Sequence, residues 1–196
     1  MSETEPKSVF QPGAHVADPA ALGLGGFALT TFVLSLVNAG IMDVSAEPAV
    51  FGLALAYGGI AQFAAGMWEF VKGNVFGATA FSSFGAFWIS FWWLTSGKWD
   101  AASETGIATY LLAWGIFTAY MMIASSKTNT VVFTVFILLT ITFFLLAFGD
   151  YGWGTGWTRA GGWVGLATAI AAWYGSFATV INFTFKREVA PIGPRG

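Results

Sequence analysis

Long apolar stretches without a charged residue alternate with short polar connections along this chain of 196 residues. An α-helix needs about 20 mostly apolar residues to cross a bilayer. Six stretches of about that length contain no Asp, Glu, Lys or Arg, and they cover residues 19–42, 48–68, 73–97, 105–126, 128–149 and 160–185. The pattern predicts an all-α membrane protein whose six transmembrane helices form one compact bundle, because only short connections are left between them.

The two ends of the chain are more polar than its middle. We expect residues 1–17 to form a polar tail, residues 18–185 the transmembrane domain, and residues 186–196 a second tail. The start of the chain is polar and of mixed charge, which is not typical of a secretory signal. A transmembrane β-barrel is not favoured either, because the run 131–148 does not alternate apolar with polar residues.

Basic residues are distributed unevenly between the predicted connections. Six spans place both termini on one side of the membrane, and cytoplasmic segments carry an excess of Lys and Arg. With cytoplasmic termini, the inner segments hold Lys7, Lys72, Lys127, Lys186, Arg187 and Arg195, whereas the outer loops hold Lys98 and Arg159. We therefore expect a multi-pass protein of the cell or plasma membrane with both termini in the cytoplasm.

The composition supports a membrane protein and excludes several kinds of chemistry. The chain is 56% hydrophobic and 9% charged, whereas soluble domains carry about 25% charged residues. A net charge of −2 gives no indication of a nucleic-acid partner. There is no cysteine, and the single histidine, His15, lies in the polar tail. We expect no metal, no cofactor and no enzymatic activity, because no thiolate, imidazole or nucleophile–base set is present.

The first apolar stretch begins with an unusual sequence, residues 18–31. Asp18 is a suitable helix N-cap, and Pro19 fits the position after it. Three glycines follow closely and permit the approach of another backbone or of a ligand. We expect this stretch to line a conduction path for a small carboxylate, and we assign to that path Asp18, Leu22, Gly23 and Thr30.

A polar stripe continues along the same predicted helix. Phe27, Thr31, Ser35 and Asn38 are spaced i, i+4, i+8 and i+11, which places them on one face. An Asn that faced lipid would be costly, so this face contacts protein or water. The alternative for Thr31 and Ser35 is that each hydroxyl donates to the carbonyl four residues earlier, and this alternative stays open.

The second stretch contributes Tyr57, Gln62 and Glu69 as further path residues. The alternative for Gln62 is a hydrogen bond that holds two helices together. For Glu69 we favour an ion pair with Lys72, three residues later. The alternative for Glu69 is a proton acceptor or gate at the inner mouth.

Polar residues of the third and last stretches complete the candidate set. Asn74 is a suitable N-cap for the third helix, and a helix N-terminus is a weak anion site. Thr79 and Ser83 lie on one face of that helix, and Asn182 lies on a small, polar face of the last one.

The candidate path contains neutral donors and aromatic rings, but no cation. The absence of charge in mid-span argues against a relay of buried carboxylates, a voltage sensor or a retinal-type Schiff base. Weak binding and easy exit suit conduction. A small monocarboxylate, or its neutral acid, fits such a path best.

Several ordered motifs resemble the acetate uptake transporter family, the succinate–acetate permeases. They are the opening stretch, residues 57–62, residues 73–85, residues 182–187 and residues 191–193. Asp18 stands where the family usually has Asn, and Ala21 where it usually has Pro. The resemblance covers almost the whole chain from Asp18 to Gly193.

The resemblance implies a ring-shaped homohexamer in which each subunit has its own path through six helices. It also implies passage of acetate and sometimes succinate, by proton symport or by an anion-channel-like route. A narrow hydrophobic constriction is expected at Phe27, at Phe84 where the family has Tyr, and at Leu139.

Two other kinds of function stay open. The first is a channel for small neutral solutes such as urea, amides or ammonia, which would use the same polar and aromatic path. The second is a membrane sensor subunit or assembly factor, which would need a larger partner-binding region than the short tails offer.

Overall fold

The structure, a computed structural model, describes residue 13 and residues 15–96 and 102–195. Most of the predicted polar tail, the end of the third predicted span at residue 97 and Lys98 lie outside the described residues.

Seven α-helices make up most of the described chain: α1 (Ala20–Asn38), α2 (Glu47–Leu55), α3 (Gln62–Lys72), α4 (Val75–Thr95), α5 (Glu104–Ser125), α6 (Thr130–Phe148) and α7 (Thr155–Phe185). A 3₁₀ turn, η1 (Val44–Ala46), precedes α2, and two π-helical segments, η2 (Ala56–Ala61) and η3 (Gly149–Trp153), follow α2 and α6.

Six of the resulting helical units are long and apolar enough to cross a membrane: Ala20–Asn38, Val44–Lys72, Val75–Thr95, Glu104–Ser125, Thr130–Trp153 and Thr155–Phe185. The predicted all-α fold with six membrane-length helices is confirmed. The first helix ends at Asn38, earlier than residue 42, because Gly40 follows with a positive φ of 73°. The last helix begins earlier than predicted, at Thr155, after Gly152 and Gly154, which also have positive φ.

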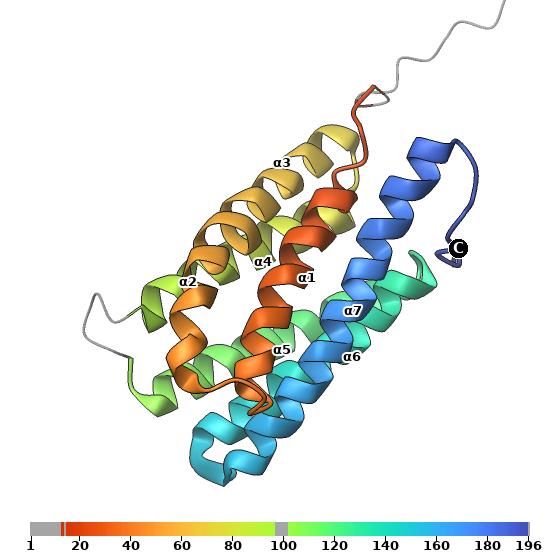
Figure 1. The fold of residues 1–196 in the computed structure, drawn as a ribbon. Helices are drawn as coiled ribbons and strands as arrows, with labels where there is room; N and C mark the ends of the chain where they lie inside the picture. Colours follow the sequence, from red (N-terminus) through yellow and green to blue (C-terminus); the bar gives the residue numbers. More distant parts are fainter. Residues whose placement is uncertain (1–12, 14, 97–101, 196) are drawn as a thin grey trace, which may run out of the picture.

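The six units form a bundle whose two termini lie at the same end (Figure 1). The most extensive packing is between α1 and α7, followed by α6 with α7, α5 with α6, and α3 with α4. We call the end that carries the start of α1 and the end of α7 the terminal end, and the opposite end the far end. Figure 1 shows α4 beside α3, against which it packs.

Small residues bring α1 and α7 close together. A Cβ on Gly162 would overlap the backbone of Ala39, and a Cβ on Gly165 would overlap the hydroxyl of Ser35. Such contacts between small residues are the usual means by which membrane helices approach closely. They place Ser35 and Ala39 of α1 directly against α7.

The second membrane-length unit is interrupted in its middle by the π-helical segment η2. The backbone carbonyl of Tyr57 lies against Gly26 of α1, and Gly58 lies against the side chain of Thr30. Gln62, the first residue of α3 after this wider turn, is buried. Single π-turns within α-helices are often found at functional sites.

The chain after α7 folds back onto the bundle. Asn182 Oδ1 accepts hydrogen bonds from the amides of Val189 (2.7 Å) and Ala190 (2.9 Å), and the amide of Thr130 donates to Gly193 (2.7 Å). The residues after α7 are therefore held against the start of α6.

Substitution of Gly162 by Ala tests the contact between α1 and α7. We expect Gly162→Ala to lower the thermal midpoint of the purified protein, because overpacking costs about 1–3 kcal/mol. Gly156→Ala in the same helix is the matched control, since a Cβ there meets no atom within 4 Å. Equal midpoints for the two variants would contradict the close contact.

Candidate functional site

Three cavities lie in a line between the two ends of the bundle. The far-end cavity has a volume of about 200 Å³, the central cavity about 20 Å³ and the terminal-end cavity about 180 Å³. Phe27 and Leu139 border both the far-end and the central cavity. Four apolar residues border both the central and the terminal-end cavity: Leu24, Ala80, Phe81 and Phe136. Shared walls therefore make the three spaces neighbours within one chain.

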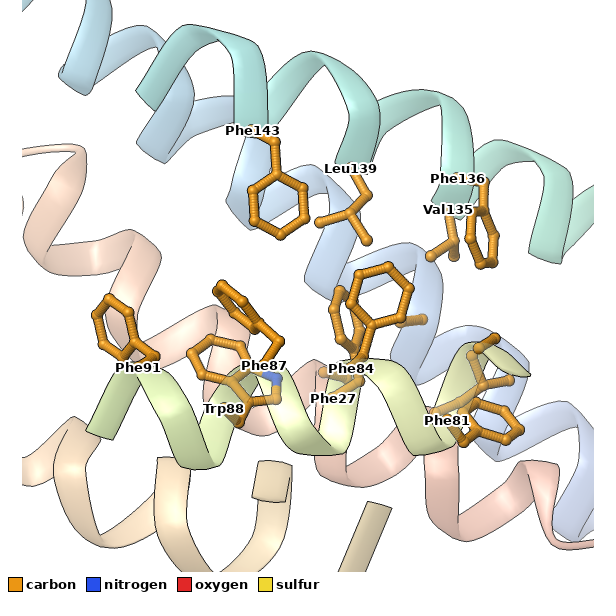
Figure 2. Packing of buried hydrophobic residues seen from close by; sticks show 14 of the residues in the cluster. Phe27, Phe81, Phe84, Phe87, Trp88, Phe91, Val135, Phe136, Leu139 and Phe143 are labelled. Carbon is orange, nitrogen blue, oxygen red and sulfur yellow. The ribbon is translucent and has the colours of Figure 1, made fainter. Parts of the chain in front are cut away.

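The central cavity is the narrow point of this line. Phe27 of α1, Phe84 of α4 and Leu139 of α6 surround it, and each is at most 4% exposed. The rings of Phe27 and Phe84 are 6.0 Å apart, and Phe84 also packs against Phe136 and Phe143 of α6. Figure 2 shows these side chains of α4 and α6 pointing toward one another across the bundle. The space holds about one water molecule at most.

Polar atoms without a partner occur along the same line. Gln62 Oε1 at the central cavity and both Thr31 Oγ1 and Trp88 Nε1 at the far-end cavity are buried and make no hydrogen bond. Thr31 therefore does not donate to the carbonyl four residues earlier, whereas Thr30 donates to Gly26 at 2.9 Å. A buried polar atom without a partner costs about 1–3 kcal/mol. A polar solute or water in these cavities would remove that cost.

The far-end cavity combines aromatic walls with an acidic border. Phe87, Trp88 and Phe91 of α4 line one side. Glu47 at the start of α2 and Asp150 after α6 border the same space. Two carboxylates disfavour the entry of an anion and favour a neutral acid or a cation.

The predicted polar stripe of α1 faces this far-end cavity. Phe27, Thr31, Ser35 and Asn38 all border it. The structure thus brings the four residues to one face, opposite α4 and α6.

The terminal-end cavity lies where three helices begin. Residues at or near the N-termini of α1, α4 and α6 border it, among them Ala20, Phe76 and Val132. Each helix N-terminus carries a partial positive charge, which attracts anions. Lys72 also borders this cavity, so the prediction that the path has no cation is wrong.

The ion pair expected between Glu69 and Lys72 is also wrong. Lys72 Nζ instead contacts Asp18 Oδ1 at 3.0 Å, because its side chain extends toward the start of α1. Asp18 Oδ1 also accepts from the amide of Ala20 at 3.1 Å, so Asp18 caps the first turn of α1 as expected. Among the described residues, one salt bridge is found, and it joins Lys72 and Asp18.

Glu69 is fully buried beside this pair. Its Oε2 accepts from Asn74 Nδ2 at 2.9 Å, and its Oε1 has no partner. Asn74 Oδ1 caps α4 by accepting from the amide of Gly77 at 3.1 Å, which confirms the predicted N-cap. The cap therefore holds the amide group of Asn74 over the Glu69 carboxyl.

Several predicted path residues lie elsewhere. Leu22 is 42% exposed and faces an open hollow beside Trp68. Gly23 lies against the ring of Phe81, and the hydroxyl of Tyr57 lies near Gly25. None of these three predicted residues borders the three cavities.

The remaining predicted residues have structural contacts. Thr30 is fully buried at the contact with η2, and Asn182 holds the chain after α7. Thr79 and Ser83 are half-buried on α4 and are not among the residues that line the three cavities.

Sequence reasoning missed several lining residues. Thr142 and Phe143 border the far-end cavity, and Asn129 borders the terminal-end cavity. The N-cap signal of an Asn before an apolar run was available for Asn129, whose Oδ1 accepts from Val132 at 2.9 Å. Among the described residues, no group of three or more His, Cys, Asp or Glu side chains is placed to hold a metal ion.

Comparison with known proteins identifies relatives of this chain. The model of the GPR1/FUN34/yaaH family matches residues 2–192. Ammonia transport outward protein 2 of Saccharomyces cerevisiae is 42% identical over 178 residues, which cover 86% of this chain and 63% of the yeast protein. This chain thus spans less than two thirds of the length of that relative.

A bacterial relative matches over nearly its whole length. The succinate-acetate/proton symporter SatP of Escherichia coli K12 is 38% identical over 182 residues, 91% of this chain and 96% of that protein. A solved structure of the bacterial acetate channel SatP superposes with a TM-score of 0.86 at 38% identity and covers 91% of this chain and 99% of that one. With its six apolar helices, the chain is an integral membrane protein.

Substitution of the two Asn caps at the terminal-end cavity tests the contact between Asn74 and Glu69. We expect Asn74→Ala to lower the thermal midpoint more than Asn129→Ala does. Each change removes a cap worth about 1 kcal/mol, but only Asn74→Ala also leaves the buried Glu69 without a donor, at about 1–3 kcal/mol more. Equal losses would contradict the role assigned to the Asn74 amide.

Proposed function

The chain belongs to the GPR1/FUN34/yaaH family, and on that premise we propose that it moves acetate and related short carboxylates, succinate among them, across a membrane. Each subunit has its own path, through the three cavities in line. The proposal assigns no enzymatic activity and no cofactor to the chain. It is supported by relatives that are named as a succinate-acetate/proton symporter and an acetate channel.

The observation that carries the proposal is the narrow apolar space between two larger cavities that each contain polar side chains. Phe27, Phe84 and Leu139 form a constriction too small for a hydrated ion. A carboxylate or its acid loses its water shell there for only a short distance, because polar atoms lie on both sides. Thr31 on the far side and Gln62 at the constriction each have a buried polar atom without a partner.

The two ends of the path favour different forms of the substrate. The three helix N-termini and Lys72 attract the anion at the terminal end. Glu47 and Asp150 favour the neutral acid at the far end. Transfer of a proton to the carboxylate between these ends would couple its movement to a pH gradient.

Glu69 is the group best placed for this proton transfer. It is a fully buried acid at the terminal-end cavity, with one oxygen free of hydrogen bonds. Ionisable groups at membrane depth are expensive and are commonly part of ion or proton pathways. We assign proton exchange with the substrate to Glu69.

The proposed orientation and assembly are supported by the sequence. The excess of basic residues at the terminal end supports a cytoplasmic location of both termini. The resemblance to the acetate uptake transporters supports a ring-shaped homohexamer. All three cavities lie within one chain, so each subunit of such a ring would conduct independently.

Uptake of radiolabelled acetate into proteoliposomes tests the proposal. We expect saturable uptake that increases when the pH is lower outside than inside. Empty liposomes give the rate at which acetic acid crosses the lipid. Protein-dependent uptake of neither acetate nor succinate would contradict the proposed function.

Widening the constriction tests the role of Phe27. We expect Phe27→Ala to increase acetate flux and to admit larger carboxylates, because it removes a ring that closes the central cavity. Phe32→Ala is the control on the same helix, since Phe32 packs on Trp173 of α7 and borders none of the cavities. Unchanged flux and selectivity in folded Phe27→Ala would place the narrow point elsewhere.

Removing the acid at position 69 tests the coupling. We expect Glu69→Gln to abolish the stimulation of uptake by a pH gradient and to leave exchange of acetate across the membrane measurable, because Gln keeps the shape and cannot carry the proton. Glu188→Gln, at an exposed acid beyond α7, is the control. Stimulation that persists in Glu69→Gln would contradict proton exchange at this residue.

A channel for ammonia or another small neutral solute is the second candidate. The yeast relative named for outward ammonia transport supports it, and so do the acidic and aromatic walls of the far-end cavity, which suit an ammonium ion. Ammonia or urea flux that acetate does not inhibit, together with no acetate uptake, would favour this function.

A further inference from the structure

We propose that the terminal-end cavity contains a carboxylate-binding site centred on Lys72, and that the side chain of Asp18 occupies this site in competition with the substrate. The inference deepens the proposed function, on which it rests. It makes Asp18 the residue that sets the affinity of this mouth for acetate.

The positive charge of the cavity converges on the position of Asp18. Lys72 Nζ lies 3.0 Å from Asp18 Oδ1. Among the described residues that border the three cavities, Lys72 is the only basic one. The N-termini of α1, α4 and α6 open onto the same cavity, and each adds a partial positive charge. A carboxylate at the position of Asp18 is therefore stabilised by Lys72 and by the helix N-termini, whereas Glu69 is the other acid at the border of this cavity.

The side chain of Asp18 has the same chemical structure as the substrate. It is a methylene group that carries a carboxylate, and acetate is a methyl group that carries one. A free acetate ion can accept the same hydrogen bond from Lys72 that Asp18 accepts now. The site is thus filled by a group of this chain that resembles the proposed solute.

The contact is weak enough to exchange. The side chains of Lys72 and Asp18 are 32% and 46% exposed. Exposed ion pairs contribute only about 0.2–1 kcal/mol. Asp18 lies before the first turn of α1, outside the packed bundle, so it can release Lys72 without a change in the helices.

A second observation indicates that the cavity receives a ligand. Glu69 is fully buried at its wall, and Glu69 Oε1 has no hydrogen-bond partner. A carboxylate that replaces Asp18 on Lys72 lies in the cavity that Glu69 borders. The same site would therefore bring the solute to the group to which we assign proton exchange.

Acetate transport by Asp18→Asn protein tests the inference. The change removes the competing charge and keeps the size of the side chain. We expect the half-saturation concentration for acetate that enters from the terminal end to fall about two- to five-fold. This is the change that the loss of one exposed ion pair produces. Glu188→Gln, which removes an exposed acid beyond α7, should leave it unchanged.

Lys72 and a neutral solute provide the controls for mechanism. Lys72→Gln should raise the half-saturation concentration, and Asp18→Asn should have no further effect in Lys72→Gln protein. Inhibition by acetamide, which has the shape of acetate without its charge, should be equal in wild type and Asp18→Asn.

The outcomes separate this inference from the proposed function. Wild-type protein that takes up no short carboxylate would contradict the proposed function. Wild-type uptake with an unchanged or raised half-saturation concentration in folded Asp18→Asn would contradict the competition alone. If Asp18→Asn lowered the half-saturation concentration for acetate equally in wild-type and in Lys72→Gln protein, that result would contradict a site centred on Lys72.

Discussion

Aromatic packing across the centre of the bundle is the interaction on which the rest of the arrangement depends. The ring of Phe84 contacts rings from α1, α5 and α6, so one residue of α4 joins three other helices. A bundle of six helices around a polar centre would leave a water-filled opening, whereas these rings reduce the middle to about 20 Å³. Polar groups can then be exposed in the larger cavities above and below without joining the two sides of the membrane by water.

The charged groups differ between the two ends of this line. Helices that alternate in direction bring the N-termini of α1, α4 and α6 to the terminal end, where Lys72 stands beside the acids Asp18 and Glu69. The far end has only the acids Glu47 and Asp150. An apolar centre between mouths that differ in this way suits a solute that changes its charge on the way. A weak acid is such a solute, and so is an amine.

The spans and the polar stripe of α1 could be predicted because periodicity and the absence of charge depend only on local sequence. The partner of Lys72 could not, because a spacing of three favoured Glu69 and the competing residue, Asp18, lies far away in sequence. Among the lining residues of α6, Leu139 was expected from the family resemblance, but Thr142 and Phe143 were not. Apolar residues occur on every side of the helix over residues 131–148, so no periodicity shows which face contains these two.

The central claim is that the three cavities form one path through each subunit, and the absence of cysteine from the chain allows a direct measurement. Single cysteines at Thr31 and Asn129 can be treated with a small, membrane-impermeant thiol reagent in proteoliposomes. The account predicts that Thr31→Cys reacts only from the far side and Asn129→Cys only from the terminal side, and that either modification blocks acetate uptake. Complete modification of Thr31→Cys without any loss of uptake would contradict it.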